Sequence, residues 1–431
     1  MMGFVNVGSM IVINLLLIKH LMLNGHINGK LNIMIYDYII IGGGIVGVST
    51  AWQLQQRYPD KKILLLEKED KFAAHQTGHN SGVIHAGVYY EPSSLKAKFC
   101  REGVQATIAF CQQYDIPFKQ CGKLLVATNS LEVKRMAALY QRCQENNIEV
   151  ELLNKQQLKV CEPNITGLGA ILVKSTGIVD YQLITTQMAQ VFKSLGGEYK
   201  LKTQVIKLNE SSEKVTVSTT AGDFDSQYLI TCSGLMADRV VKMLDIKIDF
   251  QIVPFRGEYY RLPANKNAIV NHLIYPIPDP ELPFLGVHLT RMIDGTVTVG
   301  PNAVLGFKRE GYGKININFR DIKEMVIFAG FWKVLRQNLS SGITEFKNSL
   351  FKKGYLTLVQ KYCPTVQLSD LTPHPAGIRA QAVMKDGTLV HDFLFANSDR
   401  TINVCNAPSP AATSAIPIGN YIVDKVAKHF S

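Results

Sequence analysis

The chain has 431 residues, of which 46% are hydrophobic, and this length is enough for two domains with sizeable cores. Its 46 Lys and Arg residues exceed its 35 Asp and Glu residues, and the resulting net charge of +11 suits an anionic membrane surface or an acidic substrate. No basic run is interleaved with aromatic residues, so binding to nucleic acid is disfavoured. The eight cysteines form no CxxC pair and no metal-like spacing with histidine, which indicates reduced thiols of cytoplasmic type and no metal site.

Residues 1–33 differ from the rest of the chain. The segment Ile11–Ile18 is apolar but interrupted by Asn14, and it is shorter than the roughly 18–20 apolar residues that a membrane span needs. Residues 1–33 lack the basic start and small-residue cleavage site of a signal peptide, and they lack the arginine of a transit peptide. We therefore expect residues 1–33 to be a dispensable or mis-assigned extension, with a short amphipathic membrane anchor as the alternative.

A strand, glycine turn, helix and second strand follow. The apolar run Tyr38–Ile41 leads into the turn Gly42–Gly47, a helix is predicted from Ile45 to about Arg57, and a second apolar strand ends at Leu64–Glu67. A lone GxGxxG pattern is weak, but the flanking strands and an acid at this distance predict a dinucleotide-binding unit.

Each glycine of this motif, and the acid that follows it, has a physical role in binding a dinucleotide. Gly42 allows the sharp turn, Gly44 lets the backbone approach a pyrophosphate, and Gly47 lets the helix pack closely. The N–H groups and positive end of the helix hold the phosphates. Glu67 would accept hydrogen bonds from the adenosine ribose, and both NAD and FAD fit this pattern.

Further elements alternate along the chain. Helical patterning covers Leu95–Tyr114 and Leu131–Asn146, and a last helix is predicted from about Ala412 to Lys428. Strand-like alternation occurs in five segments: Lys123–Ala127, Val215–Thr219, Tyr228–Cys232, Glu258–Leu262 and Thr296–Val299. We therefore expect a discontinuous nucleotide domain with an interleaved substrate domain.

A second small-residue loop, His75–Tyr90, distinguishes FAD from NAD. Thr77, Asn80, Ser81 and Gly82 offer hydroxyl, amide and backbone groups. An NAD enzyme has no evident use for such a loop directly after the ribose-binding acid, whereas FAD extends past the first turn toward a buried ring. The pattern favours FAD, and the alternative is a capped surface loop.

The combined pattern resembles the D-amino-acid-oxidase-like flavoprotein superfamily. The segments that carry this similarity are Ile39–Gly47, Glu67, His75–Tyr90, Gly177–Tyr181, Thr231–Asp238 and Pro254–Glu258. Within the superfamily, the chain is most similar to the L-2-hydroxyglutarate oxidase/dehydrogenase family. That similarity is carried by His272–Arg291, Val297–Val304, Phe307–Tyr312 and Asn406–Ala412, and it extends from Met34 to Lys428.

The resemblance implies an α/β fold with α+β insertions, in which a discontinuous Rossmann-like FAD-binding domain is interleaved with a β-sheet-rich substrate domain. On this basis residues 34–90, 165–245 and 374–431 form the FAD-binding domain, and residues 91–164 and 246–373 form the substrate domain.

The activity that the resemblance implies is oxidation of L-2-hydroxyglutarate to 2-oxoglutarate by hydride transfer to flavin N5, with electrons passed to a membrane quinone or to oxygen. Bacterial relatives are expected at the inner face of the cytoplasmic membrane as peripheral proteins, and a cytoplasmic location is the alternative. Another flavoenzyme of this superfamily, acting on an amino acid or glycerol-3-phosphate, is the second hypothesis. A flavin-bearing RNA-associated protein is the third, prompted by the net charge. Oligomeric state and covalent attachment of FAD stay open.

The substrate requires cations for two carboxylates. Arg379 occupies the superfamily's position for the α-carboxylate, which a bidentate guanidinium fixes in place and in plane. Arg256 is the second cation, or alternatively the salt-bridge partner of Glu258. Lys308 and Arg309 could meet the distal carboxylate, or could form an exposed charged turn.

A histidine near neutral pKa suits removal of the hydroxyl proton. His85 follows the flavin loop and His288 lies on a strand-like segment, so both are candidates for the base, with His79 and His272 weaker. Tyr275, like Tyr89 and Tyr259, could line the pocket, although strand tyrosines are usually core residues.

The remaining cofactor contacts are expected in two places. A helix beginning near Ala411–Ala412 would point its N-terminus at the flavin and stabilise the anion formed on reduction, unless Ser409, Thr413 and Ser414 are simple caps. By analogy with the superfamily, the backbone near Val205 and around Gly234 is expected at the adenine end, and Lys68, Gly377 and Pro408 are further positions expected at the cofactor.

Overall fold

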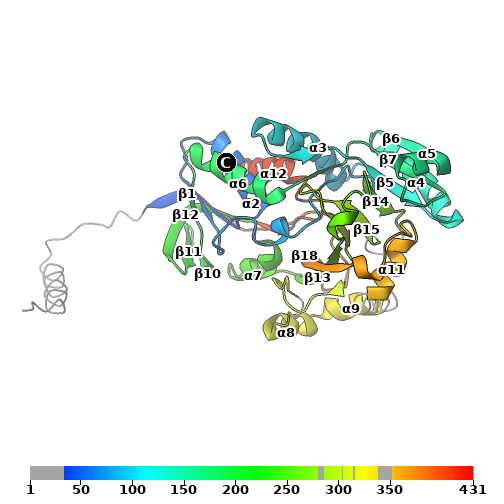
Figure 1. The fold of residues 1–431 in the computed structure, drawn as a ribbon. Helices are drawn as coiled ribbons and strands as arrows, with labels where there is room; N and C mark the ends of the chain where they lie inside the picture. Colours follow the sequence, from blue (N-terminus) through cyan, green and yellow to red (C-terminus); the bar gives the residue numbers. More distant parts are fainter. Residues whose placement is uncertain (1–33, 280–285, 303, 314–315, 338–351, 431) are drawn as a thin grey trace, which may run out of the picture. The chain divides into compact units, whose positions relative to one another are not determined.

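Two large sheets carry most of the strands in the computed structural model, which describes residues 34–279, 286–302, 304–313, 316–337 and 352–430 (Figure 1). The predicted extension of residues 1–33 lies outside these residues. From Tyr36 onward the chain packs as one unit. None of the described helices combines the length and apolar composition that crossing a bilayer requires.

The first sheet has eight strands among the described residues, in the order β10-β11-β12-β1-β2-β9, with β20 beside β12 and β19 beside β20. These strands are β1 (Ile35–Ile41), β2 (Ile63–Leu66), β9 (Glu198–Lys200), β10 (Val205–Glu210), β11 (Val215–Thr219), β12 (Gly222–Thr231), β19 (Leu394–Asn397) and β20 (Thr401–Asn406).

The apolar run in β1 is buried on both faces of this sheet. Tyr38 and Ile40 pack into one core, whereas Ile39 and Ile41 pack into another, because side chains alternate along a strand. The neighbouring pairs β1–β2 and β12–β20 are parallel, and strands of a parallel sheet covered on both faces read as continuous apolar runs.

The glycine turn between β1 and α2 (Ile45–Arg57) is packed against the strand end of β12. Gly42 has a φ of +115°, and a Cβ there would lie 2.4 Å from the carbonyl oxygen of Cys232. A Cβ on Gly47 would lie 2.0 Å from the Gly42 carbonyl oxygen. The helix boundaries predicted from the sequence are confirmed, and both glycines are required sterically.

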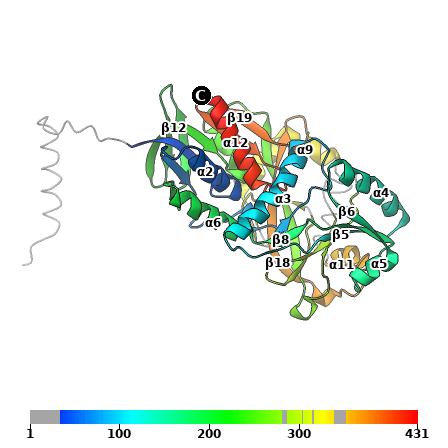
Figure 2. The ribbon, with the colours of Figure 1, turned by 90° about the horizontal axis from the view of Figure 1, so that it is seen from above.

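One face of the first sheet is covered by helices from distant parts of the chain (Figure 2). The helix α2 contacts α6 (Tyr181–Ser194) and α12 (Ala415–His429), and α12 contacts α3 (Leu95–Gln113). The expected start of the last helix near Ala411–Ala412 is wrong, because residues 411–414 form turns before α12 begins.

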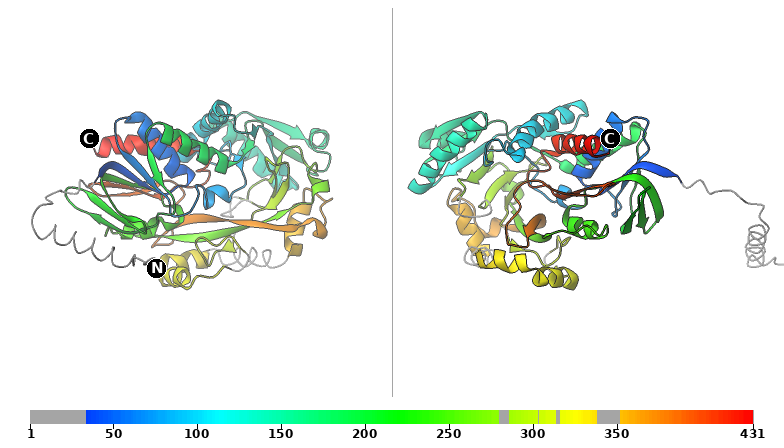
Figure 3. Two further views of the ribbon diagram at one scale, coloured as in Figure 1. Left: turned by 60° about the vertical axis from the view of Figure 1, so that its left-hand side comes forward. Right: turned by 180° about the vertical axis from the view of Figure 1, so that it is seen from behind.

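The second sheet has nine strands among the described residues, in the order β17-β13-β16-β15-β14-β5-β7-β6, with β18 beside β13. The pair β13–β18 is antiparallel, and its two long strands run across the molecule (Figure 3). The strands are β5 (Lys123–Ala127), β6 (Val150–Asn154), β7 (Gly169–Val173), β13 (Phe250–Arg261), β14 (Leu273–Pro276), β15 (His288–Arg291), β16 (Val297–Gly300), β17 (Val304–Leu305) and β18 (Thr372–Met384).

Smaller elements complete the described chain. A third sheet joins β3 (Val83–Ile84), β8 (Gly177–Val179) and β4 (Phe118–Lys119). The remaining helices are α4 (Ser130–Glu145), α5 (Lys155–Cys161), α7 (Ala237–Lys242), α8 (Phe319–Ile327), α9 (Ala329–Gln337) and α11 (Lys352–Gln360), with short 3-10 turns η1 (Gln76–Gly78), η2 (Gly234–Met236), η3 (Ala264–Lys266) and η4 (Leu368–Asp370).

The sheets depart from the domain boundaries expected at residues 91, 165 and 374. The helix α3 packs into the core beneath α2 and α12, although residues 91–164 were expected in the substrate domain. Strands β7 and β18 belong to the nine-stranded sheet, although residues 165–245 and 374–431 were expected in the FAD-binding domain. The long strand β18 therefore continues from one predicted domain into the other.

The substitution Gly47→Ala should destabilise the protein by about 2 kcal/mol or more, because the new methyl group would overlap the Gly42 carbonyl oxygen. Thermal and urea unfolding without added ligand measure this. The matched control is Gly44→Ala, whose Cβ would have Thr77 Oγ1 as its nearest neighbour at 3.5 Å; it should cost less than about 1 kcal/mol. Equal stability of the two variants would contradict the packing described for the turn.

Candidate active site

A cavity of about 840 Å³ is lined by residues of both large sheets. Ligand sites in proteins commonly have volumes of roughly 300–1,000 Å³. Its lining includes Gly42, Gly44 and Glu67, and also Arg379, His288 and Tyr275. Most positions expected at the cofactor or substrate are thus brought together in one continuous space.

A second cavity of about 480 Å³ continues from the first. Both are lined by Gly42, Glu67 and Ser233, and the second alone is lined by Lys68 and Val205. Of the two positions expected at the adenine end of the cofactor, Val205 therefore lines the second cavity, whereas Gly234 lines the first. Gly47 and Gly82 line neither cavity.

The turn after β1 presents polar groups toward the first cavity. The Gly43 N–H donates to Glu67 Oε2 at 2.6 Å, which fixes the carboxylate at the end of β2. The Ile45 N–H donates to Thr77 Oγ1 at 3.1 Å, so the Thr77 hydroxyl lies at the start of α2. The buried Ser233 hydroxyl has no protein partner among the described residues. A dinucleotide fits this donor set, with phosphates at the helix start and a ribose at Glu67.

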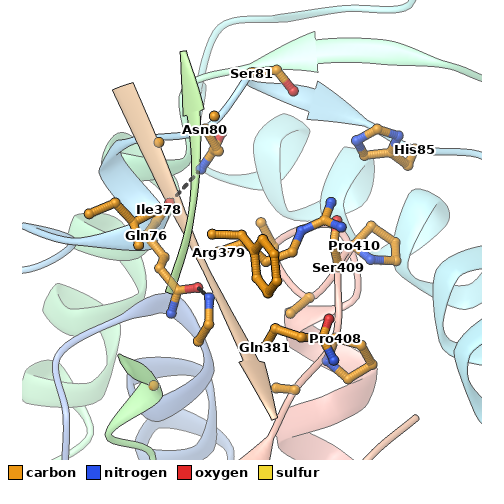
Figure 4. A pocket seen from close by; sticks show the side chains of 18 of the residues that line it. Gln76, Asn80, Ser81, His85, Ile378, Arg379, Gln381, Pro408, Ser409 and Pro410 are labelled. Carbon is orange, nitrogen blue, oxygen red and sulfur yellow. Dashed lines mark hydrogen bonds between the residues drawn. The ribbon is translucent and has the colours of Figure 1, made fainter. Parts of the chain in front are cut away.

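The loop from His75 to Tyr90 is braced internally and also joins β18. Asn80 Nδ2 donates to the Thr77 carbonyl oxygen at 2.6 Å, and Asn80 Oδ1 accepts from the Gly82 N–H at 2.8 Å. Its amide is therefore used within the loop, as the capped-loop alternative anticipated. Gln76 Oε1 accepts from the Ala380 N–H at 3.0 Å, which holds the loop against β18 beside the cavity (Figure 4).

Arg379 extends from β18 into the cavity. Its side chain is solvent-accessible, but protein surrounds the guanidinium closely enough that burial lowers its pKa, an effect opposed by Tyr90 and Tyr259. The accessible surface is therefore surface of the cavity. Figure 4 shows the Arg379 guanidinium on the side of the cavity where His85 and the Ser409–Pro410 turn lie.

Arg256 lies on the other face of the strand pair from Arg379. Arg379 is opposite Phe255 and Arg256 is opposite Ile378 in the β13–β18 register, and neighbouring side chains alternate between faces. Arg256 Nη1 donates to the Gly311 carbonyl oxygen at 2.9 Å, and its Nε lies 3.6 Å from Glu258 Oε1. Arg256 lines the cavity, but these contacts match its alternative role as the salt-bridge partner of Glu258.

Lys308 and Arg309 line neither cavity. Arg309 is 1% exposed and forms a bidentate ion pair with Asp238, in which Nη2 donates to Oδ2 at 2.8 Å. The structure thus gives Arg309 a buried role joining the 304–313 segment to α7, and does not place it where a substrate carboxylate could reach.

Both candidate histidines line the cavity, and burial holds both neutral. Burial, reinforced by Lys123, lowers the pKa of His85 to about 3. Burial also lowers the pKa of His288 to about 4, although the bond to the Gly286 carbonyl oxygen opposes this shift. The His288 Nδ1–H donates to that oxygen at 3.0 Å, which leaves Nε2 as the proton acceptor. The His288 ring stacks on Tyr275 at 3.8 Å between centroids.

Two buried lysines beside the histidines were missed by the sequence reasoning. Lys123 is 1% exposed, with its Nζ 4.9 Å from the ring centroid of Tyr89 and 5.2 Å from that of Tyr275. Lys96 lines the cavity, and burial lowers the pKa of each lysine to about 8. The available signal was a lysine that opens the otherwise apolar strand Lys123–Ala127, since buried lysine is rare.

The helix α4 contributes a further basic wall. Arg135, Ala138, Leu139 and Arg142 line the cavity from one face of the helix, as spacings of three and four residues allow. Arg135 Nη2 pairs with Asp279 Oδ1 at 3.0 Å, and Asp279 also lines the cavity. Cations thus line the cavity from α3, α4, β13 and β18.

Sequence comparison shows two levels of relationship. The model of the FAD dependent oxidoreductase family matches residues 37–425. The L-2-hydroxyglutarate dehydrogenase of Escherichia coli strain K12 is 61% identical over 392 residues, which cover 91% of this chain and 93% of that protein. The human mitochondrial L-2-hydroxyglutarate dehydrogenase is 42% identical over 413 residues, covering 92% and 89% of the two chains.

Solved structures agree with this assignment at the level of the fold. The FAD-bound L-alpha-glycerophosphate oxidase of Mycoplasma pneumoniae superposes with a TM-score of 0.74 at 21% identity, over 92% of this chain and 95% of that one. Glycine oxidase from Geobacillus kaustophilus gives 0.69 at 16% identity, over 92% and 95%. The fold is thus the expected Rossmann-like α/β fold of flavoenzymes, and the chain belongs to the L-2-hydroxyglutarate dehydrogenases within the family of FAD-dependent oxidoreductases.

Proposed function

We propose that the protein oxidises L-2-hydroxyglutarate to 2-oxoglutarate with bound FAD. The observation that carries this proposal is the Arg379 guanidinium, which extends into a cavity that also contains the neutral histidines His85 and His288. A cation for a carboxylate and an unprotonated imidazole are the two groups that a 2-hydroxy acid requires. The names of the 61% and 42% identical relatives support the same substrate.

FAD would occupy both cavities. Its pyrophosphate would lie at the Gly42–Gly47 turn, its ribose at Glu67 and its adenine toward Lys68 and Val205 in the second cavity. The flavin end would lie among residues lining the first cavity, which include Thr77, Ser81, Gly234, Gly377, Pro408, Ser409, Ala411 and Ala412. When bound, FAD supplies the acceptor for the substrate C2 hydrogen, as hydride at N5.

Arg379 would bind the carboxylate adjacent to the hydroxyl-bearing carbon. Its planar fork of donors fixes the plane of the carboxylate as well as its position. Lys96 lines the same cavity, and its pKa is lowered by burial and by the nearby Arg379 guanidinium. It is therefore a better placed cation for the distal carboxylate than Lys308 or Arg309, which line neither cavity.

His85 would take the hydroxyl proton. Its pKa is lowered by burial and also by Arg379, so the ring lies within electrostatic reach of the cation proposed for the C1 carboxylate. His288 is the second candidate, because its bond to Gly286 leaves Nε2 able to accept a proton. Tyr275, which stacks on His288, would keep that ring oriented.

We further propose that the electrons pass to a membrane quinone, or to oxygen, and that the protein acts as a peripheral protein on the cytoplasmic side of the inner membrane. This part is supported by the family resemblance alone.

Anaerobic addition of L-2-hydroxyglutarate to the FAD-bound protein should bleach the flavin absorbance. D-2-hydroxyglutarate, glycine and glycerol-3-phosphate should not. With both carboxylates bound, the C2 hydrogen of the D isomer points away from the flavin, whereas glycine has only one carboxylate and glycerol-3-phosphate has none. Bleaching by glycine or glycerol-3-phosphate and not by L-2-hydroxyglutarate would replace the proposed substrate with an amino acid or a polyol phosphate.

The variant Arg379→Met should lower kcat/KM for L-2-hydroxyglutarate by about 100-fold or more, because two charge-assisted hydrogen bonds are lost. Steady-state kinetics with an artificial electron acceptor measure this. Lys308→Met is the matched control, since Lys308 lines neither cavity, and its kinetics should be unchanged. A stronger effect of Lys308→Met than of Arg379→Met would exclude the proposed binding mode.

The pH profile identifies the base. Because burial lowers the pKa of His85 and His288 well below the ordinary value of about 6.5, both are unprotonated at neutral pH, and activity is lost only as pH falls toward the lowered pKa. The acid limb of kcat/KM should therefore lie below about pH 6.5. His85→Gln should lower kcat by about 100-fold or more and abolish the limb.

Two further variants show which histidine causes the acid limb of that pH profile. Lys123→Met removes a cation that lowers the His85 pKa, so the acid limb should move to higher pH. His288→Gln should keep a limb. If His288→Gln abolishes the limb and His85→Gln preserves it, His288 and not His85 is the base.

A further inference from the structure

Exposed apolar side chains are concentrated on and beside α8 and α9. Six of the sixteen large apolar side chains that are exposed in the described chain lie within 19 residues of sequence. Phe319 is 86% exposed and Ile327 is 71% exposed, and Phe319 has the highest exposed fraction of the sixteen. The six, here called the apolar face, are Ile317, Phe319, Val326, Ile327, Trp332 and Leu335.

The helix α8 turns its two acidic residues toward the protein and exposes three large apolar side chains, those of Phe319, Val326 and Ile327. Asp321 is 8% exposed and accepts from the Arg309 backbone N–H at 2.8 Å. Asp321 also pairs with Arg239, whose Nε donates to Glu324 at 3.0 Å. A surface helix of a water-soluble domain normally buries its apolar stripe. The exposure of three large apolar side chains on α8 therefore indicates a surface that contacts something other than water.

The helix α9 continues the apolar face. Phe331 and Val334 are buried, whereas Trp332 and Leu335 are exposed. Trp332 Nε1 donates to the Val326 carbonyl oxygen at 2.7 Å, which joins the indole to the end of α8. Figure 1 shows α8 and α9 next to one another at the side of the chain away from α2, α6 and α12, and the rear view in Figure 3 agrees.

The charges around the apolar face are predominantly positive. The basic residues of the two helices are Arg320, Lys323, Lys333 and Arg336, and the acidic residues are Asp321 and Glu324. Both acids are engaged by Arg239 beneath α8, and Glu324 also bonds Arg320. The surface around the apolar face thus carries a net positive charge, in a protein of net charge +11.

We propose that α8 and α9 dock the protein on an anionic lipid bilayer, with the apolar face inserted at the level of the headgroups. Phe, Trp and Leu on one surface with Lys and Arg at its margin are the features that place amphipathic helices in the membrane interface. Each basic residue near an anionic leaflet adds to the electrostatic attraction between protein and lipid. A second copy of this chain fits less well, since a symmetric contact would bring two basic surfaces together.

The inference is carried by surface residues and goes beyond the proposed oxidation. The six side chains of the apolar face line neither cavity. It specifies the surface through which the membrane association proposed above would occur, and lipid binding can be measured without turnover.

The sequence contains an internal reporter for this test. Trp52 and Trp332 are the two tryptophans, and Trp52 packs against the core near Phe110, so the variant Trp52→Phe leaves Trp332 as the sole emitter. The full-length, FAD-bound variant is mixed with vesicles of phosphatidylcholine alone or with phosphatidylglycerol added. With phosphatidylglycerol, Trp332 emission should shift to the blue, acrylamide quenching should fall, and the protein should float with the vesicles.

Substitutions then test the surface itself. Phe319→Ser with Ile327→Ser should abolish flotation and the Trp332 shift. The control pair Val160→Ser with Leu183→Ser, at sites 83% and 49% exposed elsewhere on the protein, should leave both unchanged. All variants should retain flavin reduction by L-2-hydroxyglutarate in solution, so failure of the lipid test and failure of the proposed oxidation are separate results.

Three outcomes would overturn the proposal. They are an unchanged Trp332 emission with phosphatidylglycerol vesicles, flotation that survives Phe319→Ser with Ile327→Ser, and a Trp332 shift that follows protein concentration without lipid. The last result, checked by sedimentation, would assign the surface to contact between copies of the chain.

Discussion

The rest of the structure depends on the pairing of β13 with β18. This antiparallel ladder runs from Phe250 opposite Met384 to Arg261 opposite Thr372. It fixes the face on which Arg379 emerges, and the bond between Gln76 and Ala380 ties it to the flavin loop. A shift of one residue would reverse the faces of all its side chains. The position of Arg379, the cation proposed to bind the substrate, is therefore a consequence of strand register.

Buried positive charge is the chemical consequence of that geometry. Arg379, Lys96 and Lys123 surround His85, and each of them disfavours its protonation. Taking a cation out of water is costly, and the cost is offset when an anion binds in the same low-dielectric space. A substrate with two carboxylates supplies that compensation, whereas an amine would add to the repulsion. In the proposed reaction, the positive charge that attracts the substrate would also keep His85 unprotonated and so able to accept a proton.

Local motifs were predictable from the sequence because their causes are local. Gly42 and Gly47 are required by contacts within one turn, and the boundaries of α2 were therefore predicted correctly. Arg309 was not predictable, since its partner Asp238 lies 71 residues away in the chain, and a basic residue in a glycine-bearing turn is normally exposed. The start of α12 was misplaced because residues 411–414 form turns before the helix begins, and residues 408–413 line the cavity.

Pairing between strands that are distant in sequence explains two features of the cavity that the sequence alone did not reveal. Lys123 opens an apolar strand, and its location among Tyr89, Tyr275 and the histidines follows from the parallel pairing of β5 with β14. The opposite faces of Arg256 and Arg379 likewise follow from register and cannot be read from either local sequence. The FAD-binding family was recognisable from motifs, but the roles within the substrate site depend on these tertiary relationships and stay proposals.

A crystal structure of the FAD-bound protein with 2-oxoglutarate tests the central claim most directly, namely that the β13–β18 register aims Arg379 at the carboxylate beside the reacting carbon. We expect the C1 carboxylate of the bound product to form two hydrogen bonds with Arg379, and its 2-oxo oxygen to lie within hydrogen-bond distance of the His85 ring. A product whose C1 carboxylate is held by Arg256, with Arg379 outside contact distance, would contradict it.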